Sequence, residues 1–124
     1  MGSHPEDRTD AAQLLAELQN EDIPNLVRAK AQELRFDDPA SNSEDDSWWC
    51  VAENQQPDRP TQTVAVRMNH HRETLTLTVT ATHKGNALYE TGKEFNLVSL
   101  ERERCLEFVR RQLDKAAEQL RASA

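Results

Sequence analysis

The chain has 124 residues, of which 30% are charged and 36% hydrophobic, and its formal net charge is −7. This length suits one domain with a single modest core beneath a heavily charged surface. The negative charge argues against a general nucleic-acid binder, which gains affinity by neutralising phosphates with lysine and arginine.

The N-terminal segment predicts helical structure after a loose start. Residues 1–4 resemble the remnant of an expression tag, and we expect residues 1–9 to be a disordered tail before a single α+β domain spanning 10–124. Asp10 is a suitable N-cap for a first helix. Pro24 lacks a backbone donor, so we expect a second helix to begin near it, or one helix with a joint, reaching Phe36.

An acidic stretch follows the helical segment. Residues 37–46 read DDPASNSEDD, which is the composition of a loop. Its carboxylates could attract a basic partner or a divalent cation, although the ligand order of an EF-hand loop, with its central glycine, is missing. We expect a solvated loop that carries the acidic residues Asp37, Asp38, Glu44, Asp45 and Asp46.

Four β-strands are predicted after this loop. They cover residues 47–52, 61–69 and 73–83, and a last strand begins near Ala87 and includes Gly92, which is expected to mark a bulge. The third strand has the clearest period of two, because threonines alternate with the apolar residues Leu75, Leu77, Val79 and Ala81.

The second and third strands are expected to form a hairpin. A two-residue turn at His70–His71 would place Val66 opposite Leu75 and Thr63 opposite Thr78. In this register the apolar residues of both strands share one face, which is the consistency that a hairpin requires.

The last segment predicts a long helix from an N-cap at Ser99 to about Arg121. Its apolar residues recur every three or four positions, so the helix should bury one face. The fold class expected is therefore α+β: a two-layer sandwich in which a four-stranded antiparallel meander is packed on one face by the N-terminal helices and the C-terminal helix.

The order of helix, strands and helix resembles that of double-stranded-RNA-binding domains. Such domains have a basic start to their final helix, which contacts phosphates. Here residues 99–104 read SLERER. This mixed charge, together with the negative net charge, argues against membership, and no family is assigned.

The strongest candidates for an interface are two tryptophans and a row of threonines. Trp48 and Trp49 are adjacent in a predicted strand, so one ring should enter the core while the other lies on the open face. An exposed tryptophan is a frequent anchor of protein interfaces. Threonine is also simply a good strand former on a solvated face. The threonine candidates on this face are Thr74, Thr76, Thr78 and Thr80.

The histidines and cysteines do not predict a metal or redox site. His83 lies far along its strand from His70 and His71, and the spacing of Cys50 and Cys105 matches no zinc or Cys-x-x-Cys pattern. Both thiols are expected to be reduced and partly buried, and a disulfide between them is the alternative. Cys105 also lies near a helix start, where a thiol can be acidified. With no transmembrane run and no signal peptide, we expect a cytoplasmic protein.

No catalytic motif is present among the common hydrolase, zinc-protease, P-loop and dinucleotide patterns. We expect a non-enzymatic acidic interaction module, such as an adaptor, chaperone or inhibitor, that binds another protein, for example a basic one. We expect no cofactor, no metal, and no binding to nucleic acid or a membrane. A homodimer is a further possibility. Two alternatives stay open: an acidic mimic that blocks a partner's nucleic-acid site, and a small-ligand enzyme whose pocket would gather Tyr89, His83 and carboxylates.

Overall fold

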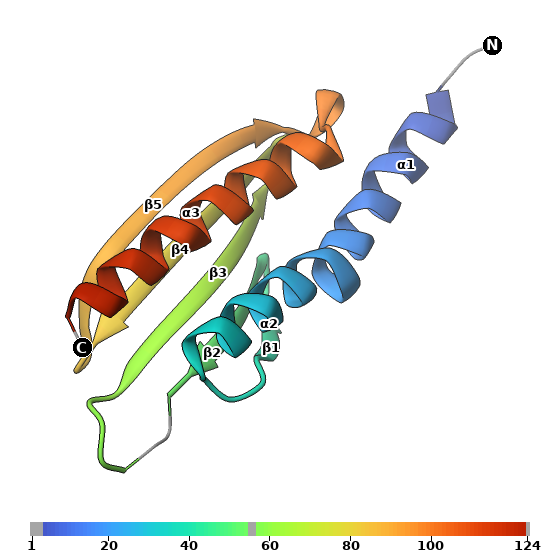
Figure 1. The fold of residues 1–124 in the computed structure, drawn as a ribbon. Helices are drawn as coiled ribbons and strands as arrows, with labels where there is room; N and C mark the ends of the chain where they lie inside the picture. Colours follow the sequence, from blue (N-terminus) through green and yellow to red (C-terminus); the bar gives the residue numbers. More distant parts are fainter. Residues whose placement is uncertain (1–3, 55–56, 124) are drawn as a thin grey trace.

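The computed structural model describes residues 4–54 and 57–123, with side chains from Ala11 onward. It has two layers, a five-stranded antiparallel sheet and a layer of helices on one face of it (Figure 1). In chain order the elements are α1 (His4–Glu17), the π-helical turn η1 (Leu18–Asp22), α2 (Ile23–Leu34), β1 (Ala40–Glu44), β2 (Ser47–Glu53), β3 (Gln62–His71), β4 (Thr74–His83), β5 (Asn86–Asn96), the 3-10 turn η2 (Leu97–Ser99) and α3 (Arg102–Ala122).

The sheet is a meander in which each strand pairs antiparallel with its neighbour in the sequence, in the order β1-β2-β3-β4-β5. The α+β class and the placement of helices before and after the sheet are confirmed. The predicted number of strands is wrong, since the described residues form five strands rather than four.

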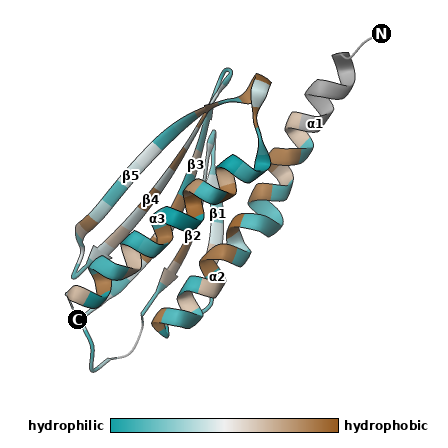
Figure 2. Ribbon diagram, turned by 45° about the horizontal axis from the view of Figure 1, so that its top comes forward, coloured by the Kyte–Doolittle hydropathy of each residue, from teal (hydrophilic) through white to brown (hydrophobic). Residues whose placement is uncertain are grey.

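The core lies between the sheet and helices α2 and α3. The core-facing residues Val66, Leu75 and Leu77 of the predicted hairpin have no exposed surface. Helix α3 presents one face to them, and Figure 2 shows alternating hydrophobic and hydrophilic bands along both helices. This pattern is typical of helices that bury one side on a sheet. The buried residues of α3 are Cys105, Leu106, Val109, Leu113, Ala116, Ala117 and Leu120.

The N-terminal helical segment has a joint, as one of the two interpretations predicted. The Ile23 N–H donates to the Leu18 carbonyl, five residues back, so the chain makes one wider π turn. Pro24 follows directly and has no N–H to donate, and the π turn accommodates this gap without ending the helix. The backbone is already helical from His4, so the helix start predicted at Asp10 is wrong.

Strand β1 is the element that the sequence did not predict. Residues 37–46 were expected to be one loop, but Ala40–Glu44 pair with Ser47–Val51 of β2. All five side chains of β1 are exposed. An edge strand that buries neither face needs no apolar alternation, and its polar composition limits pairing with other chains.

The β3–β4 hairpin turns at Arg72–Glu73 rather than at His70–His71. Paired residue numbers consequently sum to 145 instead of 141, so Val66 lies opposite Val79, and Thr63 lies opposite Thr82 rather than Thr78. The observed register pairs Met68 with Leu77, whereas the expected one would have placed Met68 opposite the charged Glu73. Because the shift is an even number of residues, each side chain keeps the face that was predicted for it.

Two local predictions near the C-terminal end are also corrected. The bulge lies at Leu88, between the pairs Ala81–Tyr89 and Thr82–Ala87, and Gly92 pairs regularly with Thr78. A Cβ at Gly92 would come within 3.3 Å of the Thr78 Oγ1 atom, so the glycine permits a close approach between β4 and β5. Helix α3 begins at Arg102 after an N-cap at Glu101, and Ser99 belongs to η2 instead.

Candidate functional site

The two adjacent tryptophans lie on opposite faces of β2, as expected. Trp48 is 7% exposed and belongs to the core cluster. Trp49 is half-buried and lies on the face away from the helices. Trp48 is therefore not a surface residue, and Trp49 is the tryptophan that a partner could contact.

Trp49 belongs to a row of side chains that crosses the open face from strand to strand. It pairs with Asn42 of β1 and with Arg67 of β3, and Arg67 pairs in turn with Thr78 of β4. The guanidinium carbon of Arg67 lies 5.5 Å from the centroid of the Trp49 ring, which is a cation–π distance. Arg67 was missed in the sequence, because only the strand pairing shows that it lies beside Trp49.

A shallow depression of about 490 Å³ lies on this face. Three of the four candidate threonines, Thr76, Thr78 and Thr80, line it, and so does Trp49. Thr74 lies on the same face but beyond the depression, opposite Asn96. The remaining lining residues are Val51, Ala65, Arg67, Asn69 and Glu90.

Glutamates flank this floor on both sides. Glu90 and Glu94 of β5 lie opposite Thr80 and Thr76 of β4, and directly paired residues share a face of the sheet. On the other side Glu44 of β1 lies opposite Ser47 of β2, two residues before Trp49. The open face therefore combines a centre of aromatic, small and hydroxyl side chains, with the one cation Arg67 beside Trp49, and an acidic rim.

The predicted acidic loop is divided between the two ends of β1. Asp37 and Asp38 precede the strand, while Glu44 ends it and Asp45–Asp46 form the turn into β2. The Asp37 N–H donates to the Glu53 carbonyl and the His70 N–H to the Asp46 carbonyl. All five acidic side chains are exposed, but they form two separate groups rather than one cluster.

The histidines occupy strand ends rather than a turn. His70 and His71 are the last residues of β3, and the His70 ring Nε2 lies 2.9 Å from the Arg72 carbonyl oxygen. His83 ends β4, where its Nδ1 lies 3.1 Å from Gln62 Nε2. Within residues 4–54 and 57–123, no group of three or more His, Cys, Asp or Glu side chains could hold a metal ion.

Both cysteines are buried thiols of the core. Cys50 lies in β2 and Cys105 in α3, and neither has exposed surface or a disulfide. Burial raises the pKa of the Cys105 thiol to about 11, and it also raises that of Cys50 although a hydrogen bond from Ser41 opposes the change. The position of Cys105 near a helix start therefore does not yield an activated nucleophile.

Tyr89 and His83, the residues named for a small-ligand pocket, contact different elements of the fold. The Tyr89 hydroxyl donates to Gln112 of α3, whereas the His83 ring contacts Gln62 of β3. Neither residue lines the depression on the open face.

Comparison with known proteins found no match: no family model, no curated protein and no solved structure matches this chain. None of the helices in the described residues is both long enough and apolar enough to cross a membrane.

Proposed function

We propose that this domain is a non-enzymatic interaction module that binds another protein through the open face of its sheet. The observation that carries the proposal is Trp49, a large aromatic side chain on a face that none of the described helices covers, held beside Arg67 and a threonine floor. Tryptophan and arginine are enriched among the residues that dominate interface energetics.

The size of the open face supports a protein as the occupant. The sheet has five strands and its longest ladders contain ten residue pairs. With strands about 4.8 Å apart and about 3.3 Å per residue, the face covers roughly 600 Å². A standard interface buries about 800 Å² on each partner, so this face would supply most of the area that such an interface needs.

The charges on the face favour a basic partner with an apolar centre. Glu44, Glu90 and Glu94 lie at the two edges of the face, and the whole chain carries a net charge of −7. Lysine or arginine side chains of a partner would meet this rim, while an aromatic or aliphatic residue would contact Trp49. Complementary charges of this kind mainly raise the association rate and the specificity.

The test begins with affinity capture from a native lysate, using the wild-type chain, Trp49→Ala and the control Val98→Ala. Val98 is 78% exposed and lies in η2, away from the open face. A partner lost with Trp49→Ala and kept with Val98→Ala is then purified, and its affinity for each chain is measured by calorimetry. Loss of an anchor residue should weaken binding about 30-fold or more, as expected for about 2 kcal/mol.

Several outcomes would overturn the proposal. If no captured protein is lost with Trp49→Ala, or if the purified pair binds both variants equally, the open face is not the interface. Binding that collapses between low and high salt, with little dependence on Trp49, would favour the acidic mimic instead, because screening weakens exposed charge pairs. A dimer in light scattering that dissociates with Trp49→Ala would identify a second copy as the occupant.

A further inference from the structure

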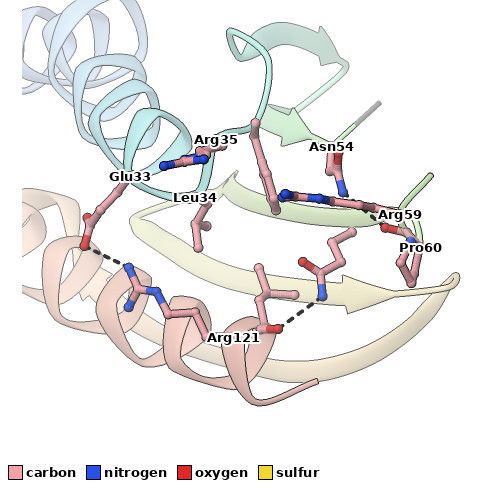
Figure 3. Close-up of a pocket in the computed structure, with 10 residues that line it drawn as sticks. Glu33, Leu34, Arg35, Asn54, Arg59, Pro60 and Arg121 are labelled. Carbon is pink, nitrogen blue, oxygen red and sulfur yellow. Dashed lines mark hydrogen bonds and ion pairs between the residues drawn. The ribbon is translucent and has the colours of Figure 1, made fainter. Parts of the chain in front are cut away.

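A second cavity, of about 350 Å³, lies at the end of the molecule where α2 and α3 both terminate. Its walls come from residues far apart in the sequence: the end of α2, the last turn of α3, the start of β3 and the segment before it (Figure 3). We call it the arginine cleft, after Arg35, Arg59 and Arg121, which line it. Its volume is at the lower end of the range of small-molecule sites.

The arginine cleft is positively charged in an acidic protein. Three arginines and one glutamate line it, whereas the whole chain has a net charge of −7. The glutamate, Glu33, is already neutralised, because its carboxylate pairs with Arg121 at 3.0 Å and with Lys30 at 2.7 Å. In the part of the chain that the structure describes, no carboxylate pairs with Arg35 or Arg59.

The helix ends reduce this charge without cancelling it. The C-terminal ends of α2 and α3 each contribute about half a negative charge. Set against a formal charge of +2 from the lining residues, this leaves about one positive charge. Arg35 and Arg121 could serve only to complement the helix ends, but Arg59 belongs to no helix, and in Figure 3 it reaches from the loop side back toward α2.

The other walls combine apolar surface with amide groups. Leu34, Phe36 and Pro60 provide the apolar part, whereas Leu120 has no exposed surface. Gln62 is held in place because its Nε2 donates to the Leu120 carbonyl at 3.1 Å and lies 3.1 Å from His83 Nδ1. These contacts fix the Gln62 side chain as a rigid polar wall of the cleft.

We infer that the arginine cleft binds a small organic anion, a carboxylate with an apolar body. The carboxylate would be held by the guanidinium of Arg59, which offers a planar pair of donors suited to two carboxylate oxygens. The apolar body would lie against Leu34, Phe36 and Pro60. About one net positive charge suits a monoanion, and this site is independent of the open face of the sheet.

The test uses phenylacetate as the probe and follows the backbone amide signals of the ¹⁵N-labelled chain by NMR. Two matched compounds separate the contributions of the charge and of the apolar ring to binding. Phenylacetamide has the same shape without the charge, and acetate has the charge without the ring. Phenylacetate should shift the signals of residues 34–36, 59, 61–62 and 120–121 saturably. The amide and acetate should bind about tenfold more weakly, since each lacks one of the two interactions.

The variant Arg59→Gln should raise the dissociation constant of phenylacetate about tenfold, as expected when one charge-assisted contact is lost. The matched control is Arg110→Gln, which removes the same charge from an exposed position of α3 that does not line the cleft. Arg59 is itself an exposed residue, so the fold should tolerate the change, and circular dichroism checks this.

The inference is overturned by any of three results. One is the absence of saturable shifts in the cleft at phenylacetate concentrations up to about 10 mM, ten times a 1 mM dissociation constant. Another is equal affinity for phenylacetate and phenylacetamide. The third is an equal loss of affinity in Arg59→Gln and Arg110→Gln, which would show only an effect of net charge.

Discussion

Arg102, the first residue of α3, forms a two-point ion pair with Asp22, the last residue of the π turn. Its Nε and Nη2 atoms lie 2.8 Å and 2.7 Å from the two carboxylate oxygens. The pair joins segments 80 residues apart, so it links the joint of the N-terminal helix to the start of the last helix. The fork of a guanidinium matches a carboxylate in this geometry.

The Asp22–Arg102 pair predicts a dependence of stability on pH. The hydrogen bond from Arg102 lowers the pKa of Asp22 below its ordinary value of 3.8, against the opposing effect of burial. A carboxyl group whose pKa is lower in the folded state stabilises the fold above its unfolded pKa, and this contribution is lost as the pH falls through the folded value. Asp22→Asn should therefore be less stable than wild type at pH 7, and the difference should vanish in strong acid.

Urea unfolding of both proteins between pH 2 and pH 7 measures this difference. The control is Asp58→Asn, which alters an exposed loop residue that has no ion pair in the described structure. An Asp22→Asn difference that stays constant over the whole range would contradict the prediction.

The position of Lys30 predicts that its apolar stem and its charge contribute separately to the stability of the fold. Its ammonium group lies 2.6 Å from Asp114 of α3 and 2.7 Å from Glu33, while the residue as a whole is 9% exposed. Lys30→Met keeps most of the apolar stem and should cost about 1 kcal/mol, because both carboxylates stay partly solvated. Lys30→Ala should cost about 1–2 kcal/mol more, since it also removes buried methylenes.

Urea unfolding at pH 7 tests this order, and equal losses in the two Lys30 variants would contradict it. Burial alone would lower the pKa of Lys30, but the hydrogen bonds from its ammonium to Asp114 and Glu33 raise it above 10.5 overall. Because the pKa of Lys30 is higher in the folded protein than in the unfolded chain, its contribution to stability is complete below the unfolded-state pKa. This contribution is lost only as the pH rises through the folded-state pKa. Neutral pH is therefore the right condition for the comparison.

The two tryptophans should differ sharply in their effect on stability. Trp48 is 7% exposed within the core, so Trp48→Ala should cost about 3–5 kcal/mol. Trp49 lies on the open face, and Trp49→Ala should cost about 1 kcal/mol or less. Urea unfolding followed by circular dichroism gives both values. Similar losses in the two variants would mean that Trp49 also supports the core and could not serve as a clean interface probe.

The cysteines should be unreactive until the protein unfolds. Cys50 and Cys105 have no exposed surface, and burial raises the pKa of both thiols, that of Cys105 to about 11. Because the thiolate is the reactive form, Ellman's reagent at pH 8 should label neither residue within minutes in the native protein and both in guanidinium chloride. Rapid native labelling, or fewer than two thiols after unfolding, would contradict this prediction.

Local alternation determined which residues face the core and which face outward. The period of two in β4 placed Leu75 and Leu77 inside and the threonines outside, and it separated Trp48 from Trp49. These assignments survived the wrong hairpin register because the shift was even, and an even shift leaves every side chain on its face. The long apolar stripe of α3 was equally visible, since one side of that helix must be buried.

Only the tertiary structure decided the features that depend on pairing between distant segments. Strand β1 buries neither of its faces, so it has no apolar pattern, and only its hydrogen bonds to β2 make it a strand. Arg67 lies over Trp49 through cross-strand pairing, and Arg59 and Arg121 line one cleft because α3 ends beside the start of β3. Local periodicity in the sequence reports which face of a single helix or strand is buried. These sites are instead made by contacts between elements, and the packing of the whole chain determines where the elements lie relative to one another.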